Sequence, residues 1–506
     1  MEHFDVLIIG AGLSGIGAAR QLQEKSPEKT FAILEARDVI GGTWDLFRYP
    51  GIRSDSDMYT MGYDSKPWLD AKAIADGPSI LAYVKEAATE RGLDERIRFG
   101  NRMKRARWSS ADSTWTVESQ TANGEIVEFS CNVLFVCSGY YNYEQGYIPK
   151  LEGIENFSGQ VVHPQKWPED LDLSGKRVVI IGSGATAMTL VPALAKTAAK
   201  VTMLQRSPTY VVSMPAEDPI ARMLNKLLPE KLAYRLIRWK NVQFQRFFYC
   251  QSRIRPEKVK QKLLSLVRKE LGEDFDVETH FTPSYNPWDQ RLCLVPDSDL
   301  FKVLRTEKAT VVTDEIERIT ADGILLRSGE TLEVDTIVTA TGLVLEVLGG
   351  AHFEVDGEPV HFPDTYSYKG MMFSGVPNLI YTIGYINASW TLRSELVAEY
   401  VCRLVNHMDE HHVTQCTPRL RASDLGMPTY QMIKDFSPGY MERGMHLFPK
   451  QGENDPWRNT QNYTADKQTI RKGPISDDVL DFANARALPA GQAAKGAESS
   501  PVKSAA

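Results

Sequence analysis

The stretch Asp5-Val-Leu-Ile-Ile-Gly-Ala-Gly-Leu-Ser-Gly15 decides the fold of this chain. The apolar residues after Asp5 predict a buried strand, and glycines spaced as Gly-x-Gly-x-x-Gly predict a tight turn into a helix. In a strand–turn–helix unit of this kind, the backbone amides of the turn and the helix N-terminus bind phosphate groups. The stretch therefore predicts a dinucleotide-binding unit built from parallel strands and helices.

The residue that closes the next strand indicates which dinucleotide binds. An apolar strand is predicted at residues 31–34, and Glu35 follows it. A carboxylate at this place accepts hydrogen bonds from ribose hydroxyls and repels a 2′-phosphate. We therefore expect the first loop to bind FAD. In Gly41-Gly-Thr-Trp44, which follows, we expect backbone amides that meet FAD; a simple turn is the alternative interpretation.

A second loop of the same type, Gly182-x-Gly184-x-x-Ala187, ends in different chemistry. It follows the predicted strand at residues 177–181, and its next strand, at residues 201–204, runs into Gln205-Arg206-Ser207. A cation beside a hydroxyl suits a 2′-phosphate. The second loop therefore predicts NADPH, and the two loops together predict a flavoprotein that takes electrons from NADPH.

Length and composition agree with this interpretation and exclude others. A chain of 506 residues exceeds what one core usually supports, so two or three domains are expected. The net charge of −7 disfavours nucleic acid as a partner. Six cysteines without C-x-x-C spacing disfavour a redox dithiol and a zinc site, so no metal is expected. No signal peptide is predicted before the first strand, and the expected location is the cytoplasm.

The fold class expected is α/β, with two dinucleotide-binding (Rossmann-like) domains and a helical insert. The expected segments are 1–145 and 343–487 for the FAD domain, 146–215 and 285–342 for the NADPH domain, 216–284 for the insert and 488–506 for a disordered tail.

The insert differs in charge from the rest of this acidic chain. Between Arg222 and Lys269 it has fourteen Lys and Arg residues and two acids, Glu230 and Glu257. Our first interpretation is a solvated helical cap over the active site. The alternative is attraction to an anionic membrane surface, which would place the protein peripherally at the inner face of the membrane.

A longer motif lies between the two loops. Phe157-Ser-Gly-Gln-Val-Val-His163-Pro-Gln-Lys-Trp167-Pro168 matches the spacing F-x-G-x-x-x-H-x-x-x-W-P. With it, this chain resembles the Baeyer–Villiger monooxygenases and, more broadly, the class B flavoprotein monooxygenases. The stretches at residues 41–55, 138–143 and 286–291 resemble in particular the bacterial subgroup that activates ethionamide. The resemblance covers nearly the whole chain except its C-terminal tail, and we expect a structural role for His163, joining the two domains.

The resemblance implies roles for three charged residues. Arg291 would supply the fixed cation that stabilises negative charge on the reacting oxygen, and Asp55 would hold that arginine. Arg53, together with Ser54, would face the nicotinamide nucleotide. One departure concerns Gln290, because many relatives have a lysine there that helps to hold the 2′-phosphate. NADPH preference would then depend mainly on Arg206 and Ser207.

The loops and the resemblance together give two sets of candidate cofactor residues. For FAD they are Gly10, Gly12, Ser14, Gly15, Glu35, Gly42, Thr43, Trp44, Asp45, Leu46, Asp55 and Met103. For NADPH they are Arg53, Ser54, Gly182, Ser183, Gly184, Ala185, Thr186, Ala187, Arg206, Ser207 and Gln290.

The expected activity is insertion of one oxygen atom from O2 into a ketone to give an ester or lactone, with S-oxygenation of sulfides and thioamides as a further reaction. Two alternatives stay open. One is an N- or S-oxygenating flavin monooxygenase without ketone activity, and the other is a non-oxygenating NADPH–flavin reductase or redox sensor. The partners expected are O2 and a small ketone or sulfide.

Overall fold

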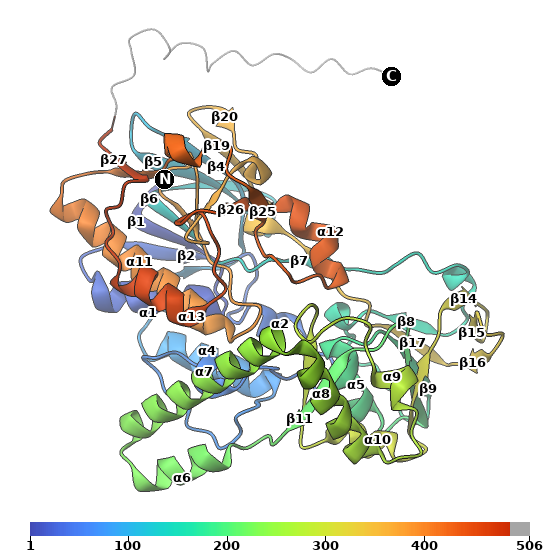
Figure 1. Cartoon of the computed structure of the whole chain (residues 1–506). Helices are drawn as coiled ribbons and strands as arrows, with labels where there is room; N and C mark the ends of the chain where they lie inside the picture. The colour runs from blue at the N-terminus through green and yellow to red at the C-terminus, as the bar shows by residue number, and fades with distance from the viewer. Residues whose placement is uncertain (486–506) are drawn as a thin grey trace, which may run out of the picture.

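The computed structural model describes residues 1–485 and contains two domains, one built on a mixed sheet and one on a parallel sheet, joined along one side. The first lies in the upper part of Figure 1, and the second lies at the lower right. The tail predicted at residues 488–506 lies outside the described residues. The expected α/β fold with two dinucleotide-binding domains is confirmed.

The first domain is built around the strand that opens the sequence. Strand β1 (Glu2–Ile9) pairs in parallel with β2 (Phe31–Leu34) on one side and β6 (Ile126–Val136) on the other. The sheet has nine strands in the order β20-β19-β4-β5-β6-β1-β2-β3, with β23 also paired to β6. The remaining strands are β3 (Ile97–Arg98), β4 (Asn101–Ser109), β5 (Thr114–Thr121), β19 (His352–Val355), β20 (Glu358–Pro359) and β23 (Leu379–Tyr381). Strands from residues 2–136 and from residues 352–381 therefore share one sheet.

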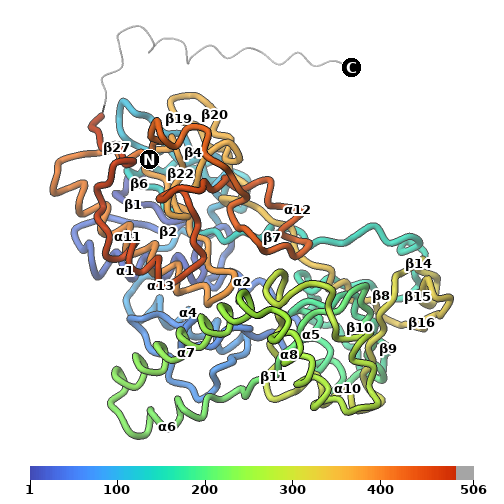
Figure 2. The backbone as a smooth tube through the Cα atoms, viewed as in Figure 1, coloured from blue at the N-terminus to red at the C-terminus, as the bar shows by residue number. Residues whose placement is uncertain are grey.

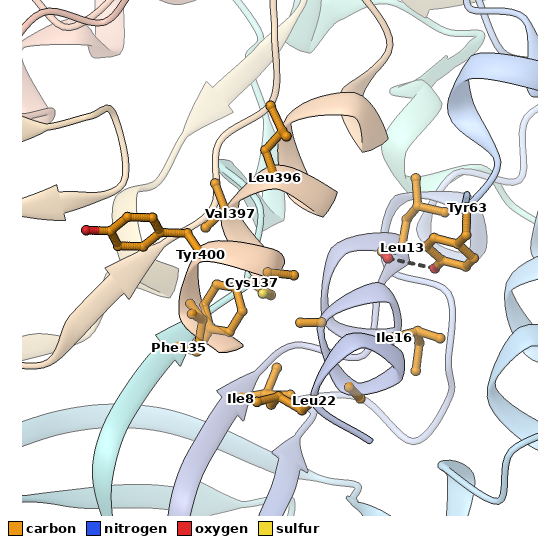
Figure 3. Close-up of a cluster of buried hydrophobic side chains, with 14 of the residues drawn as sticks. Ile8, Leu13, Ile16, Leu22, Tyr63, Phe135, Cys137, Leu396, Val397 and Tyr400 are labelled. Carbon is orange, nitrogen blue, oxygen red and sulfur yellow. Dashed lines mark hydrogen bonds between the residues drawn. The ribbon is translucent and has the colours of Figure 1, made fainter. Parts of the chain in front are cut away.

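Helices α1 (Leu13–Lys25) and α11 (Trp390–Glu410) pack together against this sheet. In the close-up of Figure 3, Leu396, Val397 and Tyr400 of α11 lie on one side of α1, and Tyr63 lies on the other. The Tyr63 hydroxyl donates a hydrogen bond to the carbonyl oxygen of Leu13 at 2.7 Å. This contact and the buried apolar cluster fix the start of α1, where the first glycine loop ends.

The second domain has a five-stranded parallel sheet in the order β13-β10-β9-β17-β8. Its strands are β8 (Gln160–Val162), β9 (Arg177–Ile181), β10 (Lys200–Gln205), β13 (Ala309–Thr313) and β17 (Thr336–Thr339). Helix α5 (Ala185–Leu194) begins after the second glycine loop, and α10 (Asp299–Leu304) packs against it. Residues 178–195 carry no charged side chain. They belong to β9, the second glycine loop and α5 and do not form one long apolar helix.

The insert forms four helices that connect the two domains. They are α6 (Pro219–Leu227), α7 (Glu230–Ile254), α8 (Pro256–Leu271) and α9 (Val277–Phe281). Figure 2 shows α6 and α7 as a hairpin that extends at the lower left, away from the second sheet. Among the described residues, no helix combines the length and the apolar character needed to cross a membrane.

Shorter elements complete the described part of the chain. They are α2 (Thr43–Leu46), α3 (Met58–Met61), α4 (Gly77–Thr89), β7 (Tyr141–Gly146), β11 (Tyr210–Met214), β12 (Leu292–Pro296), β14 (Ile316–Ile319), β15 (Gly323–Leu326), β16 (Thr331–Glu333), β18 (Leu343–Leu345), β21 (Ser367–Tyr368), β22 (Met372–Phe373), β24 (Gln415–Pro418), β25 (Thr429–Gln431), α12 (Gly439–Gly444), β26 (Lys450–Gly452), α13 (Tyr463–Asp466) and β27 (Leu480–Ala483).

Candidate active site

One large cavity lies where the two domains meet, with a volume of about 1570 Å3. Both glycine loops line it, as do residues of the insert and of the segment that contains α12. Parallel sheets bind nucleotides at the carboxyl ends of their strands, and both loops follow such strand ends. A single cavity therefore faces both predicted nucleotide sites.

The first glycine loop is shaped for close backbone packing. Gly10 has φ +103°, and a Cβ there would lie 2.8 Å from the carbonyl oxygen of Cys137. A Cβ on Gly15 would lie 1.8 Å from the carbonyl oxygen of Gly10, so this glycine lets α1 approach the strand. At Gly12 a Cβ makes only ordinary contact, 3.5 Å from Gly42, and this residue lines the cavity. The loop thus leaves open space at the position that a pyrophosphate needs.

Glu35 closes β2 inside this cavity and is almost fully buried. One carboxylate oxygen accepts a hydrogen bond from the amide of Ala11 at 2.7 Å, and the other accepts from the amide of Arg37 at 2.9 Å. Burial raises the pKa of Glu35, while these amides act in the opposite direction. The amides orient both carboxylate oxygens, and their remaining lone pairs suit ribose hydroxyls.

Three polar atoms of the cavity lining are buried without a hydrogen-bond partner among residues 1–485: Arg37 Nη1, Gln245 Oε1 and Trp288 Nε1. Buried polar groups normally have partners, so these atoms are available for hydrogen bonds to a ligand in the cavity. Arg37 lies two residues after Glu35, and its Nη2 pairs with Asp45. A donor near the carboxylate that we predicted to accept hydrogen bonds from ribose fits a dinucleotide with its anionic phosphates, so these residues suit FAD.

The second glycine loop is more open than the first. Gly182 has φ +138°, and a Cβ there would lie 2.3 Å from the carbonyl oxygen of Ala340. A Cβ on Gly184 would meet no atom within 4 Å. Arg206 is exposed, lines the cavity and forms no hydrogen bond or ion pair with another residue in the described range. A free cation at the end of β10 fits the 2′-phosphate of NADPH.

Arg291 and Asp55 meet within the same cavity. Arg291 Nη1 lies 3.2 Å from Asp55 Oδ2, and Arg291 Nη2 donates to the Tyr440 hydroxyl at 3.1 Å. The neighbouring Tyr440, and after it Asp55, raise the pKa of Arg291 well above its ordinary value, although burial acts against them. The guanidinium is therefore a permanent cation held from two sides.

Aromatic side chains surround this cation. The rings of Tyr140 and Trp390 stack with centroids 5.3 Å apart, and the Tyr140 hydroxyl lies 2.9 Å from the Tyr141 hydroxyl. Burial raises the pKa of both tyrosines. Trp390 Nε1 donates to Ser14 Oγ at 2.7 Å, which connects this aromatic wall to the first glycine loop.

Arg53 lines the cavity and forms an ion pair with Asp299 at the start of α10. This pairing connects the stretch at residues 41–55 to the second domain. Ser54 is buried behind it and accepts a hydrogen bond from the amide of Ser56 at 2.9 Å. Arg53 therefore pairs with Asp299 and takes no part in the Arg291–Asp55 pair.

Four of the predicted cofactor residues do not line the cavity. They are Gly15, Asp45, Leu46 and Ala187. Asp45 is buried and holds Arg37 and Arg48 in ion pairs, while Ala187 is fully buried in the second domain. These residues support the lining from behind it, and the other predicted site residues are part of the lining.

His163 lies outside the cavity lining, at the junction of the domains. Its Nδ1 accepts from the amide of Gln165 at 3.2 Å, and its Nε2 faces the carbonyl oxygen of Gly342 at 3.3 Å. Burial lowers the pKa of His163. The ring therefore connects the segment before β9 to the residues after β17, both of the second domain, and its expected role in joining the two domains stays a prediction.

Sequence reasoning missed several residues of the lining. Tyr440, Trp390 and Asn387 come from the part of the chain after residue 345, where no motif was recognised. Tyr440 follows Ser437-Pro-Gly439, a pattern that predicts a turn but does not indicate a residue of the active site. Its contact with Arg291 depends on tertiary packing alone.

No metal site was expected, and one group of possible ligands is found among residues 1–485. His407 and Glu410 of α11 and His411, which follows the helix, have ligand atoms within 4.8 Å of one another. None of the three lines the cavity. All six cysteines are free.

Comparisons with known proteins give the following likenesses. The profile of the flavin-binding monooxygenase-like family matches residues 4–346. The FAD-containing monooxygenase EthA of Mycobacterium tuberculosis is 53% identical over 491 residues, which cover 97% of this chain and 99% of that protein. The solved structure of oxidized steroid monooxygenase bound to NADP has a TM-score of 0.74 at 21% identity, covering 95% of this chain and 100% of that chain. Polycyclic ketone monooxygenase from Thermothelomyces thermophila has a TM-score of 0.73 at 19% identity, covering 96% of this chain and 90% of that chain.

Proposed function

This chain belongs to the flavin-binding monooxygenase-like family, and we propose that it is an FAD- and NADPH-dependent Baeyer–Villiger monooxygenase. The overall reaction converts a ketone, O2, NADPH and a proton into an ester or lactone, NADP+ and water. The observation that carries this proposal is the Arg291–Asp55 pair in a cavity shared by both glycine loops.

When bound, FAD accepts a hydride from the nicotinamide and activates O2, so the difficult chemistry belongs to the cofactor. In this proposal, Gly10, Gly12 and the N-terminus of α1 bind the FAD pyrophosphate, and Glu35 accepts hydrogen bonds from its ribose. Gly182, Gly184 and Arg206 hold NADPH, with Arg206 on the 2′-phosphate.

Arg291 then has one electrostatic task. Oxygen insertion into a ketone places negative charge on oxygen atoms near the attacked carbonyl, and a fixed cation stabilises that charge. Asp55 and Tyr440 orient the guanidinium before the reaction begins, so the protein does not have to reorganise. The known relatives support this proposal through their family and their fold. One structure that shares the fold is that of a protein named polycyclic ketone monooxygenase.

The test is product analysis with purified holoenzyme, NADPH and 18O2 on a panel of ketones and sulfides. We expect one labelled oxygen atom in an ester or lactone for each NADPH oxidised. Labelled sulfoxide without any ester would favour the S-oxygenating alternative. NADPH oxidation that yields only hydrogen peroxide with every compound would favour the reductase alternative.

A further inference from the structure

The hairpin of helices α6 and α7 has apolar residues on its solvent side. On α6, Ile220, Met223 and Leu227 are exposed, and they are spaced by three and four residues, which places them on one helix face. Ile220 also belongs to the cavity lining. On α7 the exposed apolar residues of the solvent side are Leu232, Leu236, Trp239, Phe247 and Ile254, while a sixth exposed residue, Phe244, lines the cavity. We call the residues other than Phe244, eight in all, the α6–α7 surface.

The residues of α7 in this surface also lie on one side of the helix. Their separations of four, three, eight and seven residues fit a single helical face. The opposite face is buried, with Ala233, Tyr234 and Ile237 packed into the protein. Trp239 is 64% exposed and Phe247 is 63% exposed, which is unusual for aromatic residues of a monomer. The exposed stripe therefore lacks a partner among the described residues.

Basic residues accompany this apolar stripe. Residues 219–255 contain nine Lys and Arg residues and a single acid, Glu230, in a chain whose net charge is −7. Lys226, Lys231, Arg235, Arg246 and Arg255 are exposed and form no ion pair with another residue of the described range. A cap that only shields a cavity needs a polar outer face, so shielding does not explain this composition. Exposed apolar residues beside unpaired cations are typical of helices that lie in the surface of an anionic membrane.

The hairpin is held firmly, so the apolar stripe is a fixed feature of the fold. Arg238 Nη2 pairs with Glu395 Oε2 of α11 at 2.6 Å, and Lys240 pairs with Asp218 at the start of α6. Figure 1 shows α6 and α7 extending past the sheets at the lower left. The inner side of α7 lines the cavity through Asn241, Gln245 and Phe248. Helix α7 therefore has one face on the cavity and another in solvent.

From these observations we propose that the α6–α7 surface docks on an anionic lipid bilayer. The apolar residues enter the interface between headgroups and acyl chains, and the five unpaired cations contact the lipid phosphates. Docking in this way brings the α7 wall of the cavity to the lipid surface. The proposal does not depend on which compound is oxygenated.

The test is flotation of the FAD-loaded protein with vesicles of phosphatidylcholine, with or without phosphatidylglycerol. We expect binding to vesicles that contain phosphatidylglycerol, weakening as salt is raised, and little binding to phosphatidylcholine alone. Trp239→Ser with Phe247→Ser should weaken vesicle affinity about tenfold or more. Arg235→Glu with Arg246→Glu should weaken it by about tenfold or more as well.

Matched variants use exposed residues elsewhere on the protein. Ile126→Ser with Leu425→Ser removes two other exposed apolar side chains, and Lys104→Glu with Lys200→Glu reverses two other exposed cations. Both should bind vesicles like the unchanged protein, and the flavin spectrum checks that every variant is folded. Absence of vesicle binding, or equal loss in the matched variants, would overturn the proposal. So would a concentration-dependent dimer that Trp239→Ser and Phe247→Ser abolish while no vesicles are bound, since the stripe would then contact a second copy of this chain.

Discussion

The guanidinium of Arg291 lies 3.2 Å from the carboxylate of Asp55, although 236 residues separate the two in the chain. Asp55 comes from the segment after the first glycine loop, and Arg291 directly precedes β12 next to the second domain. The pair therefore forms only when both domains are folded and joined. This relationship makes Arg291 the residue on which the proposed chemistry can be tested most directly.

Replacing Arg291 by alanine should abolish ester formation while leaving FAD bound. Loss of one fixed charge that stabilises a developing oxyanion costs about 10²–10³ in kcat, and no other cation pairs with Asp55 in the described structure. NADPH should still be oxidised, more slowly, with release of hydrogen peroxide. Product yield, peroxide and flavin content are measured together.

Arg253→Ala serves as the matched control for this variant. Arg253 pairs with Asp289 close to the same loop, and neither residue lines the cavity. Its ester yield should stay near that of the unchanged protein. Normal ester formation by Arg291→Ala would refute the role proposed for this arginine.

Asp55→Ala should produce a milder form of the same defect. The cation stays in place through Tyr440 but loses one of its two supports, so we expect a loss of about tenfold to a hundredfold in kcat. Asp55→Ala combined with Arg291→Ala should be no worse than Arg291→Ala alone, because both changes act on one cation. Additive losses in steady-state kinetics would mean that the two residues act independently.

Arg206→Ala should weaken NADPH binding much more than NADH binding. A charge-assisted contact to the 2′-phosphate contributes about 1.5–3 kcal/mol, which corresponds to roughly tenfold to 150-fold in Kd. NADH lacks that phosphate and should be nearly unaffected. The Michaelis constants for both nucleotides are the measurement, and equal losses would show that Arg206 does not select the phosphate.

Gln290→Lys is the complementary gain-of-function change. Gln290 lines the same cavity as Arg206, and a lysine there would add a second cation for the phosphate. We expect a lower Michaelis constant for NADPH and little change for NADH. If both constants stayed the same, Gln290 would have no part in the phosphate site.

Gly12→Leu should prevent FAD binding without preventing folding. The backbone of Gly12 has φ −81°, which any residue can adopt, and a Cβ there makes only ordinary contact with Gly42. The larger side chain would fill the space proposed for the pyrophosphate. Gly10→Leu is a poorer test, because Gly10 has φ +103° and its Cβ would clash with backbone.

Gly184→Leu is the matched change in the second loop. Its Cβ would meet no atom within 4 Å, so this variant should fold, keep FAD and lose affinity for NADPH. Flavin absorbance of the purified proteins separates the two effects. Full FAD occupancy in Gly12→Leu, or loss of FAD in Gly184→Leu alone, would reverse the assignment of the loops.

Arg238→Met should destabilise the protein through the insert. Arg238 donates to the carbonyl oxygen of Gly62 at 2.7 Å and pairs with Glu395, and both charged side chains are buried. Removing one partner of a buried pair costs about 3–5 kcal/mol. Burial already raises the pKa of Glu395, so without Arg238 this carboxyl would tend to take a proton. A fall in the melting temperature measured by flavin fluorescence checks this, and an unchanged melting temperature would contradict it.

Sequence alone determined the two nucleotide folds, because local patterns are sufficient for them. Apolar runs of strand length followed by spaced glycines specify a strand, a turn and a helix within about twenty residues. Glu35 and Arg206 are found by their distance from those glycines, and both line the cavity. The family match over residues 4–346 confirms the resemblance that the F-x-G-x-x-x-H-x-x-x-W-P motif indicated.

Only the tertiary structure decided what surrounds the cation and how the insert is oriented. Tyr440 reaches Arg291 because the segment after residue 345 returns to the first sheet through β19 and β23, a path that no local pattern encodes. The same holds for Asp299, which becomes the partner of Arg53 only when the domains join. The sequence predicted that residues 216–284 form a helical insert, but the two sides of α7 became distinct only through packing, which buries Ile237 and leaves Trp239 in solvent. Contacts between distant segments depend on the packing of the whole chain, and therefore spacing in the sequence does not reveal them.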